Sequence, residues 1–215
     1  MLKMGVEESI QEAIEEARKR VQKIDIGYET FLQKARRYAQ EGNIDIVEQI
    51  EEIKRARYKS LLPLAIGEAN ERAQNGKKGF QIFLAIAQSY ASRLGEDIAE
   101  HIGIIERRGY ERATELELDN AKNMAKVGDI GFQSALEKAE LYHNIVKLHI
   151  DNEIIAIKKT GYSSIIPGIL EKAEERATNG DSKYMPLLKT AEGYAAKINM
   201  DISTKVNEIK KIYNG

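Results

Sequence analysis

The stretch Ala35-Arg36-Arg37-Tyr38-Ala39 decides the fold, because it returns three more times at a fixed distance along the chain. The later versions are Ala87-Gln88-Ser89-Tyr90-Ala91, Ala139-Glu140-Leu141-Tyr142-His143 and Ala191-Glu192-Gly193-Tyr194-Ala195. Their tyrosines are 52 residues apart each time, with no insertion or deletion in the series. Self-similarity at a fixed period of this order indicates a repeat architecture.

Other columns of residues keep the same step. They include Ala17, Ala69, Ala121 and Ala173; Leu32, Leu84, Leu136 and Leu188; Ile46, Ile98, Ile150 and Ile202; and the aromatic series Tyr28, Phe80, Phe132 and Tyr184. Four copies of 52 residues therefore cover 8–59, 60–111, 112–163 and 164–215, and we treat 1–215 as a single repeat domain. Constant length in copies whose exposed positions differ predicts that each copy presents the same faces to its neighbours. A duplicated bundle without stacking is the alternative.

The spacing of apolar residues predicts three helices in each copy. Steps of three and four residues place Ile10, Ile14 and Ala17 on one face of a first helix. First helices are expected over 8–23, 60–75, 112–127 and 164–179, second helices over 28–41, 80–94, 132–147 and 184–197, and third helices from Asp45, Asp97, Asp151 and Asp201. We therefore predict an all-α tandem helical repeat, α-solenoid-like, with four units of three helices in a right-handed curved stack.

Glycine and proline mark the predicted helix ends. A glycine column closes the first helix through a left-handed conformation, and the first copy has Ile24 there, so its turn is expected to differ. Pro63 and Pro167 are expected in the first turn of that helix, where a missing N–H costs nothing. Gly109 and Gly161 are expected to break or bend the path between copies. The glycine column consists of Gly76, Gly128 and Gly180.

Composition excludes several function classes. The chain has 33 Lys+Arg, 34 Asp+Glu and no cysteine, so disulfides, thiolate metal sites and cysteine nucleophiles are ruled out. The near-zero net charge argues against a general nucleic-acid binder. No run approaches the ~20 apolar residues of a membrane helix, and the acidic start does not fit a signal peptide. We expect a cytoplasmic protein with no membrane association.

No motif for catalysis or for a cofactor is found. Glu140-x-x-His143 has the spacing of a di-iron ligand pair, but the chain has no second Glu-x-x-His to complete the site. The pair His149 and Glu153 is equally isolated. The lysine-rich turn Asn75–Gly79 could meet a phosphate, although ordinary turn chemistry explains it and its counterparts carry aspartate. We predict no catalytic, cofactor-binding or metal-binding residue.

The helix pair expected over residues 118–142, LDNAKNMAKVGDIGFQSALEKAELY, resembles a tetratricopeptide-type hairpin. Small residues face a partner helix in it, and a Gly-Asp turn joins the two helices. That family repeats at about 34 residues, whereas three helices per unit are closer in outline to armadillo-type repeats. The resemblance is one of class. It implies a curved stack whose groove binds another protein.

Two columns form the candidate partner surface. They are Tyr38, Tyr90, Tyr142 and Tyr194, and Arg20, Arg72 and Arg176 with Met124 as the exception. The tyrosines would close gaps between copies, or would stack on a peptide or on bases. The arginine stems would cover apolar surface, or the guanidinium groups would grip an acidic partner. We predict a non-catalytic scaffold or adaptor that binds another protein through a groove, with a nucleic-acid-binding or nucleotide-binding repeat protein as the alternative.

Overall fold

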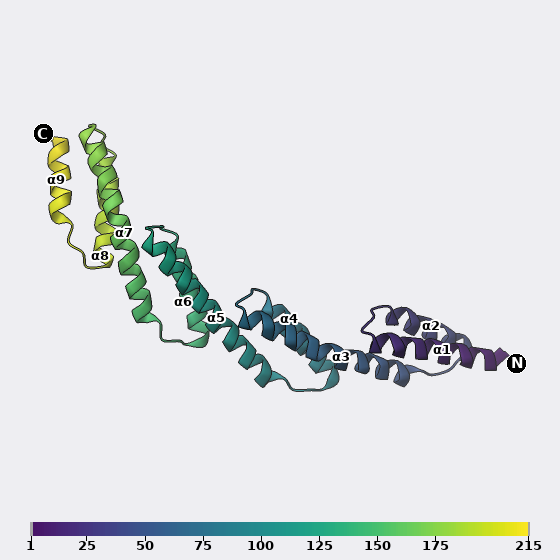
Figure 1. The fold of residues 1–215 in the computed structure, drawn as a ribbon. Helices are drawn as coiled ribbons and strands as arrows, with labels where there is room; N and C mark the ends of the chain where they lie inside the picture. The colour runs from purple at the N-terminus through teal and green to yellow at the C-terminus, as the bar shows by residue number, and fades with distance from the viewer. Residues whose placement is uncertain (1, 215) are drawn as a thin grey trace. The chain divides into compact units, whose positions relative to one another are not determined.

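A computed structural model describes residues 2–214, and every regular element in that range is an α-helix (Figure 1). The helices are α1 (Leu2–Gln22), α2 (Tyr28–Gly42), α3 (Val47–Gln74), α4 (Phe80–Leu94), α5 (Ala99–Lys126), α6 (Phe132–Val146), α7 (Asp151–Thr178), α8 (Tyr184–Lys197) and α9 (Ser203–Asn214). The all-α prediction is confirmed. Within these described helices, none is both long and apolar enough to cross a membrane.

The chain divides into two compact units, Met1–Gly109 and Tyr110–Gly215, next to the boundary at residue 111 in the sequence pattern. In the first unit α1 packs on α2, α3 packs on α4, and α1 also contacts α3. In the second unit α7 packs on both α8 and α9, and α6 contacts α7. The helical hairpin is therefore a building element of both units.

The prediction of three helices per copy is wrong, because the third helix of one copy runs into the first helix of the next. The resulting helices α3, α5 and α7 each have 28 residues. Gly109 and Gly161 lie inside α5 and α7 and do not break them. Their missing side chains serve packing instead, since a Cβ on either glycine would come within 2.6 Å of a phenylalanine ring.

Pro63 and Pro167 also lie inside α3 and α7 rather than at a helix start. An internal proline removes one backbone hydrogen bond and crowds the preceding turn. Both side chains are exposed, so the carbonyl group left without an N–H partner lies on a side of the helix where water can bond to it. The first-turn prediction is wrong because no helix begins at this point.

Alanines make the close helix contacts. In α2 the buried side chains are Tyr28, Leu32, Ala35 and Ala39, and Ala17 of α1 is fully buried. Short side chains on both helices let the two backbones approach, as predicted for the hairpin. The same buried pattern recurs in α8 with Tyr184, Leu188, Ala191 and Ala195.

The glycine column ends helices as predicted. Gly76, Gly128 and Gly180 have φ of 63°, 70° and 67°. Ile24, which takes their place after α1, has φ 58°. The first copy therefore makes the same turn with a β-branched residue, contrary to our expectation that this turn would differ. Such a conformation is strained for any residue with a Cβ, and most of all for a β-branched one.

Aspartates lie in the turns that follow the second helix of a copy, and they cap the helix that comes next. An Oδ1 atom accepts a hydrogen bond from the backbone N–H two residues later at Asp45, Asp97 and Asp201, each at 2.9 Å. These three aspartates are residues at which third helices were predicted to begin. The hydrogen bond from Ser203 N–H, together with the Ser203 side chain, lowers the pKa of the Asp201 carboxyl. The cap is therefore in its charged, accepting form over the neutral pH range.

Candidate functional site

The outer side of the first hairpin carries a groove of about 430 Å³ between α1 and α2. Charged side chains of α1 form one wall, including Glu12, Glu15 and Lys19, and Phe31 and Lys34 of α2 contribute to the other. Tyr38, from the predicted tyrosine column, also lines the groove and is half-buried. The groove is open and polar, and its walls carry both signs of charge.

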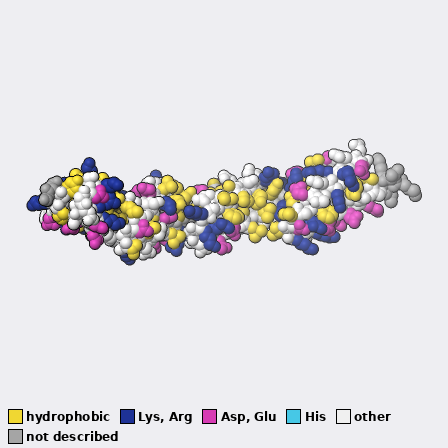
Figure 2. All heavy atoms as spheres, turned by 90° about the horizontal axis from the view of Figure 1, so that it is seen from above, with side chains coloured by type: hydrophobic (Ala, Val, Ile, Leu, Met, Phe, Trp, Pro, Cys, Tyr) yellow, Lys and Arg dark blue, Asp and Glu magenta, His cyan; other side chains and the backbone are white. Residues whose placement is uncertain are grey.

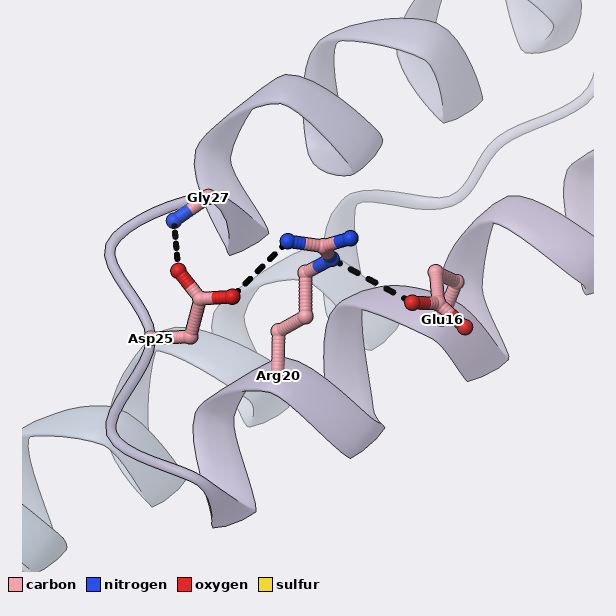
Figure 3. Close-up of polar contacts among 4 residues, drawn as sticks. All are labelled: Glu16, Arg20, Asp25 and Gly27. Atoms are coloured by element: carbon pink, nitrogen blue, oxygen red, sulfur yellow. Dashed lines mark hydrogen bonds and ion pairs between the residues drawn. The ribbon is translucent and has the colours of Figure 1, made fainter.

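Arg20, from the predicted arginine column, lies along the turn that closes this hairpin (Figure 3). Its Nε donates to Glu16 at 3.2 Å, and its Nη1 donates to Asp25 Oδ2 at 2.7 Å. The other oxygen of Asp25 accepts the backbone N–H of Gly27 at 2.8 Å. The guanidinium group also covers the ring of Phe31, 4.7 Å from its centroid. Arg20 therefore links the end of α1 to the start of α2.

The pKa of Asp25 is shifted in the direction that these contacts predict. The backbone hydrogen bond from Gly27 and the guanidinium of Arg20 lower the pKa of the Asp25 carboxyl. A Cβ atom on Gly27 would stand 2.8 Å from Arg20 Nη1, although Gly27 itself has an ordinary φ of −65°. A larger residue here would displace the end of the Arg20 side chain, and the fourth copy, which has Lys183 in this column, holds its Arg176–Asp181 contact at the longer distance of 3.5 Å.

The other two arginines of the column make related contacts. Arg72 Nε donates to Glu68 at 2.6 Å, and its guanidinium lies 4.7 Å from the centroid of the Phe83 ring. Arg176 Nη1 lies 3.5 Å from Asp181 Oδ2. These are contacts within a hairpin. The role of the column as a partner surface stays a prediction, and its members already have intramolecular partners.

The tyrosine column forms pairs with a second set of tyrosines. Tyr90 stacks on Tyr58 with centroids 5.6 Å apart, and Tyr194 stacks on Tyr162 at 4.9 Å. Tyr142 is tilted against Tyr110 at 6.0 Å. Tyr38 instead has the guanidinium of Arg37 over its ring at 5.2 Å. All four rings of the column are half-buried and in contact.

In two of these tyrosine pairs a basic side chain also contacts the rings. Arg93 donates to the Tyr58 hydroxyl at 3.0 Å and lies 5.1 Å from its ring centroid. Lys197 donates to the Tyr162 hydroxyl at 3.3 Å and contacts the rings of both Tyr162 and Tyr194. A face that already contacts a cation or a second ring is not free to stack on a base. This arrangement favours the packing role of the tyrosines.

Ion pairs join the first and third helical segments of a copy. Lys122 lies 2.5 Å from Glu153, and Lys205 lies 2.8 Å from Glu174. The two pairs stand 52 residues apart with the signs exchanged, since Glu174 takes the column of Lys122 and Lys205 that of Glu153. The hydrogen bonds to these glutamates raise the pKa of both lysines.

The residues weighed from sequence as candidates for chemistry do not form a site among the described residues. Glu140 accepts a hydrogen bond from Lys158 at 3.1 Å, and Nδ1 of His143 is buried without a hydrogen-bond partner. Among the described residues, no three metal-ligating side chains converge. In the turn Asn75–Gly79, the N–H of Lys77 donates to the Arg72 carbonyl at 2.8 Å. That amide is therefore already used for helix termination.

Sequence reasoning missed two features of the hairpins. Four residues in one column adopt left-handed φ after the second helix of each copy, namely Asn43, Gly95, Lys147 and Asn199. The partners of the tyrosine column were also missed, although Tyr58, Tyr110 and Tyr162 precede their partners by a constant 32 residues. A search for fixed offsets between columns, as well as within them, would have found the pairs.

No protein-family model matches the sequence, and comparisons with curated proteins and with solved structures find no similar one. The functional argument therefore rests on the side chains of this chain alone.

Proposed function

We propose that this protein is a non-catalytic scaffold or adaptor, built as an α-solenoid-like series of four 52-residue units, that binds another protein through the outer faces of its hairpins. One observation supports this proposal above others. Equivalent positions of the hairpins keep their buried residues and change their exposed ones. Glu12 and Lys34 in the first copy correspond to Leu64 and Ile86 in the second.

Constant buried residues combined with variable exposed residues are typical of repeat proteins that bind a partner. The buried alanines, leucines and aromatic residues hold a constant hairpin, and the exposed positions then vary without cost to the fold. The groove between α1 and α2 is open, polar and of mixed charge. An open groove of this kind suits a segment of another protein better than an enclosed small molecule.

The alternative is a protein that binds nucleic acid or a nucleotide. It would use the tyrosine column for stacking and the arginine column for phosphate groups. Two observations count against it. Tyr90, Tyr142 and Tyr194 contact other tyrosines, and Arg20 and Arg72 contact carboxylates of their own helix.

Affinity capture tests the proposed function. The full chain is immobilised and exposed to extract of its source cells, with and without nuclease treatment. We expect a defined protein to be retained in both conditions. Retention of nucleic acid, or loss of the captured protein after nuclease treatment, would favour the alternative function.

A deletion tests the repeat series. Removal of residues 60–111 joins Lys59 directly to Arg112, so that the start of α3 continues into the end of α5 with every column in register. We expect the shortened chain to fold with the same helicity per residue and a lower Tm, because stability in such arrays is a sum of local terms. A deletion of half that length would join unmatched faces. If the half-length deletion folds and the full one does not, the repeat series is wrong.

A further inference from the structure

Helix α4 carries exposed isoleucines at two positions where the second helices of the other three copies have polar residues or proline. Ile82 is 64% exposed and Ile86 is 36% exposed, and both project from the same side of the helix. Ala85 and Ser89 lie between and beside them and are also exposed. Positions 82, 85, 86 and 89 follow the spacing of one helical stripe. Arg93 is the single charged residue of α4, so the stripe itself carries no charge.

The fold does not need these isoleucines. The corresponding residues are Thr30 and Lys34 in α2, Ser134 and Lys138 in α6, and Pro186 and Thr190 in α8. Each of those helices forms with polar side chains or proline at the two positions. The apolar pair on α4 therefore has a purpose outside the hairpin itself.

Helix α3 extends this apolar face. In the first copy Glu12, Lys34 and Phe31 line one groove. The residues in those columns of the second copy are Leu64, which is 52% exposed, Ile86 and Phe83. Two charged positions of the first groove are thus apolar in the second hairpin, whereas the columns of Glu16 and Lys19 remain charged there, as Glu68 and Glu71. In Figure 2, hydrophobic side chains gather along the stretch that α3 and α4 occupy, whereas charged side chains of both signs mix over α1 and α2.

The end of the stripe is basic. Ile82 Cδ1 and Arg72 Nη1 lie 3.9 Å and 4.0 Å from the position of a Cβ on Gly79, so both reach the α3–α4 turn. Lys77 and Lys78 form that turn and are exposed. Glu68 neutralises Arg72, and Glu71 in the last turn of α3 is also exposed, so the two lysines give this end a net positive charge. The first turn of α4 carries no acidic residue to offset its dipole.

Lys77 is also a departure from the pattern of the chain. The other three turns have Asp25, Asp129 and Asp181 in this column, and each accepts a backbone N–H two residues later at 2.8 or 2.9 Å. The α3–α4 turn lacks this hydrogen bond, and Gly79 there adopts φ 89° instead. A stabilising acidic residue has been replaced by a basic one on the same hairpin that carries the exposed isoleucines.

We propose that the face formed by Leu64, Ile82, Ile86 and the Lys77-Lys78 turn binds an amphipathic helix of a partner protein whose apolar stripe is flanked by acidic residues. This inference rests on the proposed protein-binding function and names the surface and the chemistry of the partner. A helix fits because the exposed apolar residues of α4 follow helical spacing and Leu64 of α3 stands in the column of Glu12, which lines the groove of the first hairpin. Since every regular element of the described residues is helical, there is no sheet edge among them to which a strand could add. Acidic flanks fit because they meet the lysines of the turn.

The test is a selection from displayed helical peptides with a fixed apolar stripe and randomised flanking positions, using the full chain as bait. Peptides enriched by the wild type are then measured against the double variant Ile82→Thr, Ile86→Lys, which installs the residues of α2. The matched control is Ser134→Ala, Lys138→Ala at the same positions of α6. Circular dichroism checks that all variants keep their helicity.

We expect acidic flanks to be enriched, binding to weaken about tenfold or more in the α4 variant, and the α6 control to bind as the wild type does. Lys77→Asp, which restores the residue of the other turns, should weaken binding of these peptides about fivefold.

Enrichment of basic or neutral flanks, or binding that the α4 variant retains, would overturn the inference. Failure to enrich any peptide would overturn it too. The proposed function is judged separately, because capture of a partner protein by both the wild type and the α4 variant would preserve it while placing the interface elsewhere.

Discussion

The ring of Phe132 rests against the backbone of Gly161 in the middle of α7, so closely that a Cβ on the glycine would stand 2.6 Å from Cε1 of the ring. Phe80 and Gly109 repeat this relationship in the first unit, again at 2.6 Å. In the other two copies the phenylalanine is replaced by tyrosine, and the column of the glycine then holds a large residue. The guanidinium of Arg57 covers Tyr28 at 5.5 Å, and the Tyr213 ring lies 4.7 Å from that of Tyr184.

Substitution of Gly161 by alanine should destabilise the second unit. The added methyl group forces the ring of Phe132 or the helix to move, and overpacking of this kind costs about 1–3 kcal/mol. The matched control is Gly168→Ala in the same helix, where a Cβ meets nothing within 4 Å. The control should gain up to about 1 kcal/mol from helix propensity. Urea unfolding measures both, and equal effects would refute the packing role of Gly161.

Substitution of Ile24 by glycine should stabilise the first unit by about 1 kcal/mol, because glycine adopts positive φ without strain. Ile24 is 41% exposed, so only part of its side chain packs against the hairpin. Gly180→Ala is the reverse test, since φ there is +67° and a Cβ has open space. It should lower the Tm. A lower Tm for Ile24→Gly would mean that the side chain contributes more than its conformation costs.

Alkaline pH should destabilise the first unit through Tyr28. Burial, assisted by the hydrogen bond to the Glu29 carboxylate, raises the pKa of Tyr28 from 10.0 to about 12. The unfolded state therefore loses this proton first, and the associated stability is complete below pH 10 and declines as pH rises through 12. Absorbance at the tyrosinate band should show a late titration step. Tyr28→Phe should abolish it, and its persistence in that variant would reject the assignment.

Exchange of charges between Lys122 and Glu153 should be tolerated, because the pair Glu174 and Lys205 already has the opposite polarity. Lys122→Glu alone places two carboxylates together and should lower stability by about 0.5 kcal/mol, an effect that added salt screens. The double variant Lys122→Glu, Glu153→Lys should recover it. A double-mutant cycle without coupling would show that the two side chains do not interact in solution.

Local structure was predictable from sequence wherever one residue type has one physical role. The left-handed glycines such as Gly128, the capping aspartates such as Asp97, and the second helix of each copy all lie where their pattern predicts. Such features depend on neighbours a few residues away. A fixed spacing is therefore sufficient to find them.

The long helices were not predictable in the same way. Gly161 looks like a helix end until the ring of Phe132 is known to lie on it. Its role depends on a residue 29 positions earlier, and local patterns cannot distinguish a glycine for flexibility from a glycine for space. The arginine column raised the same problem, because Arg20 has an acceptor, Asp25, that becomes its partner only when the turn closes.

Helix α3 continues across the border between the first two sequence copies. The borders of the sequence repeat therefore differ from the sites at which a protease can cut. A cut between residues 59 and 60, at the border of two sequence copies, would fall in the interior of α3. The accessible peptide bonds instead lie in turns such as those near Lys77 and near Asp45. Limited digestion should therefore yield fragments whose ends fall in turns, and every fragment that contains the whole of α3, α5 or α7 should carry parts of two neighbouring copies.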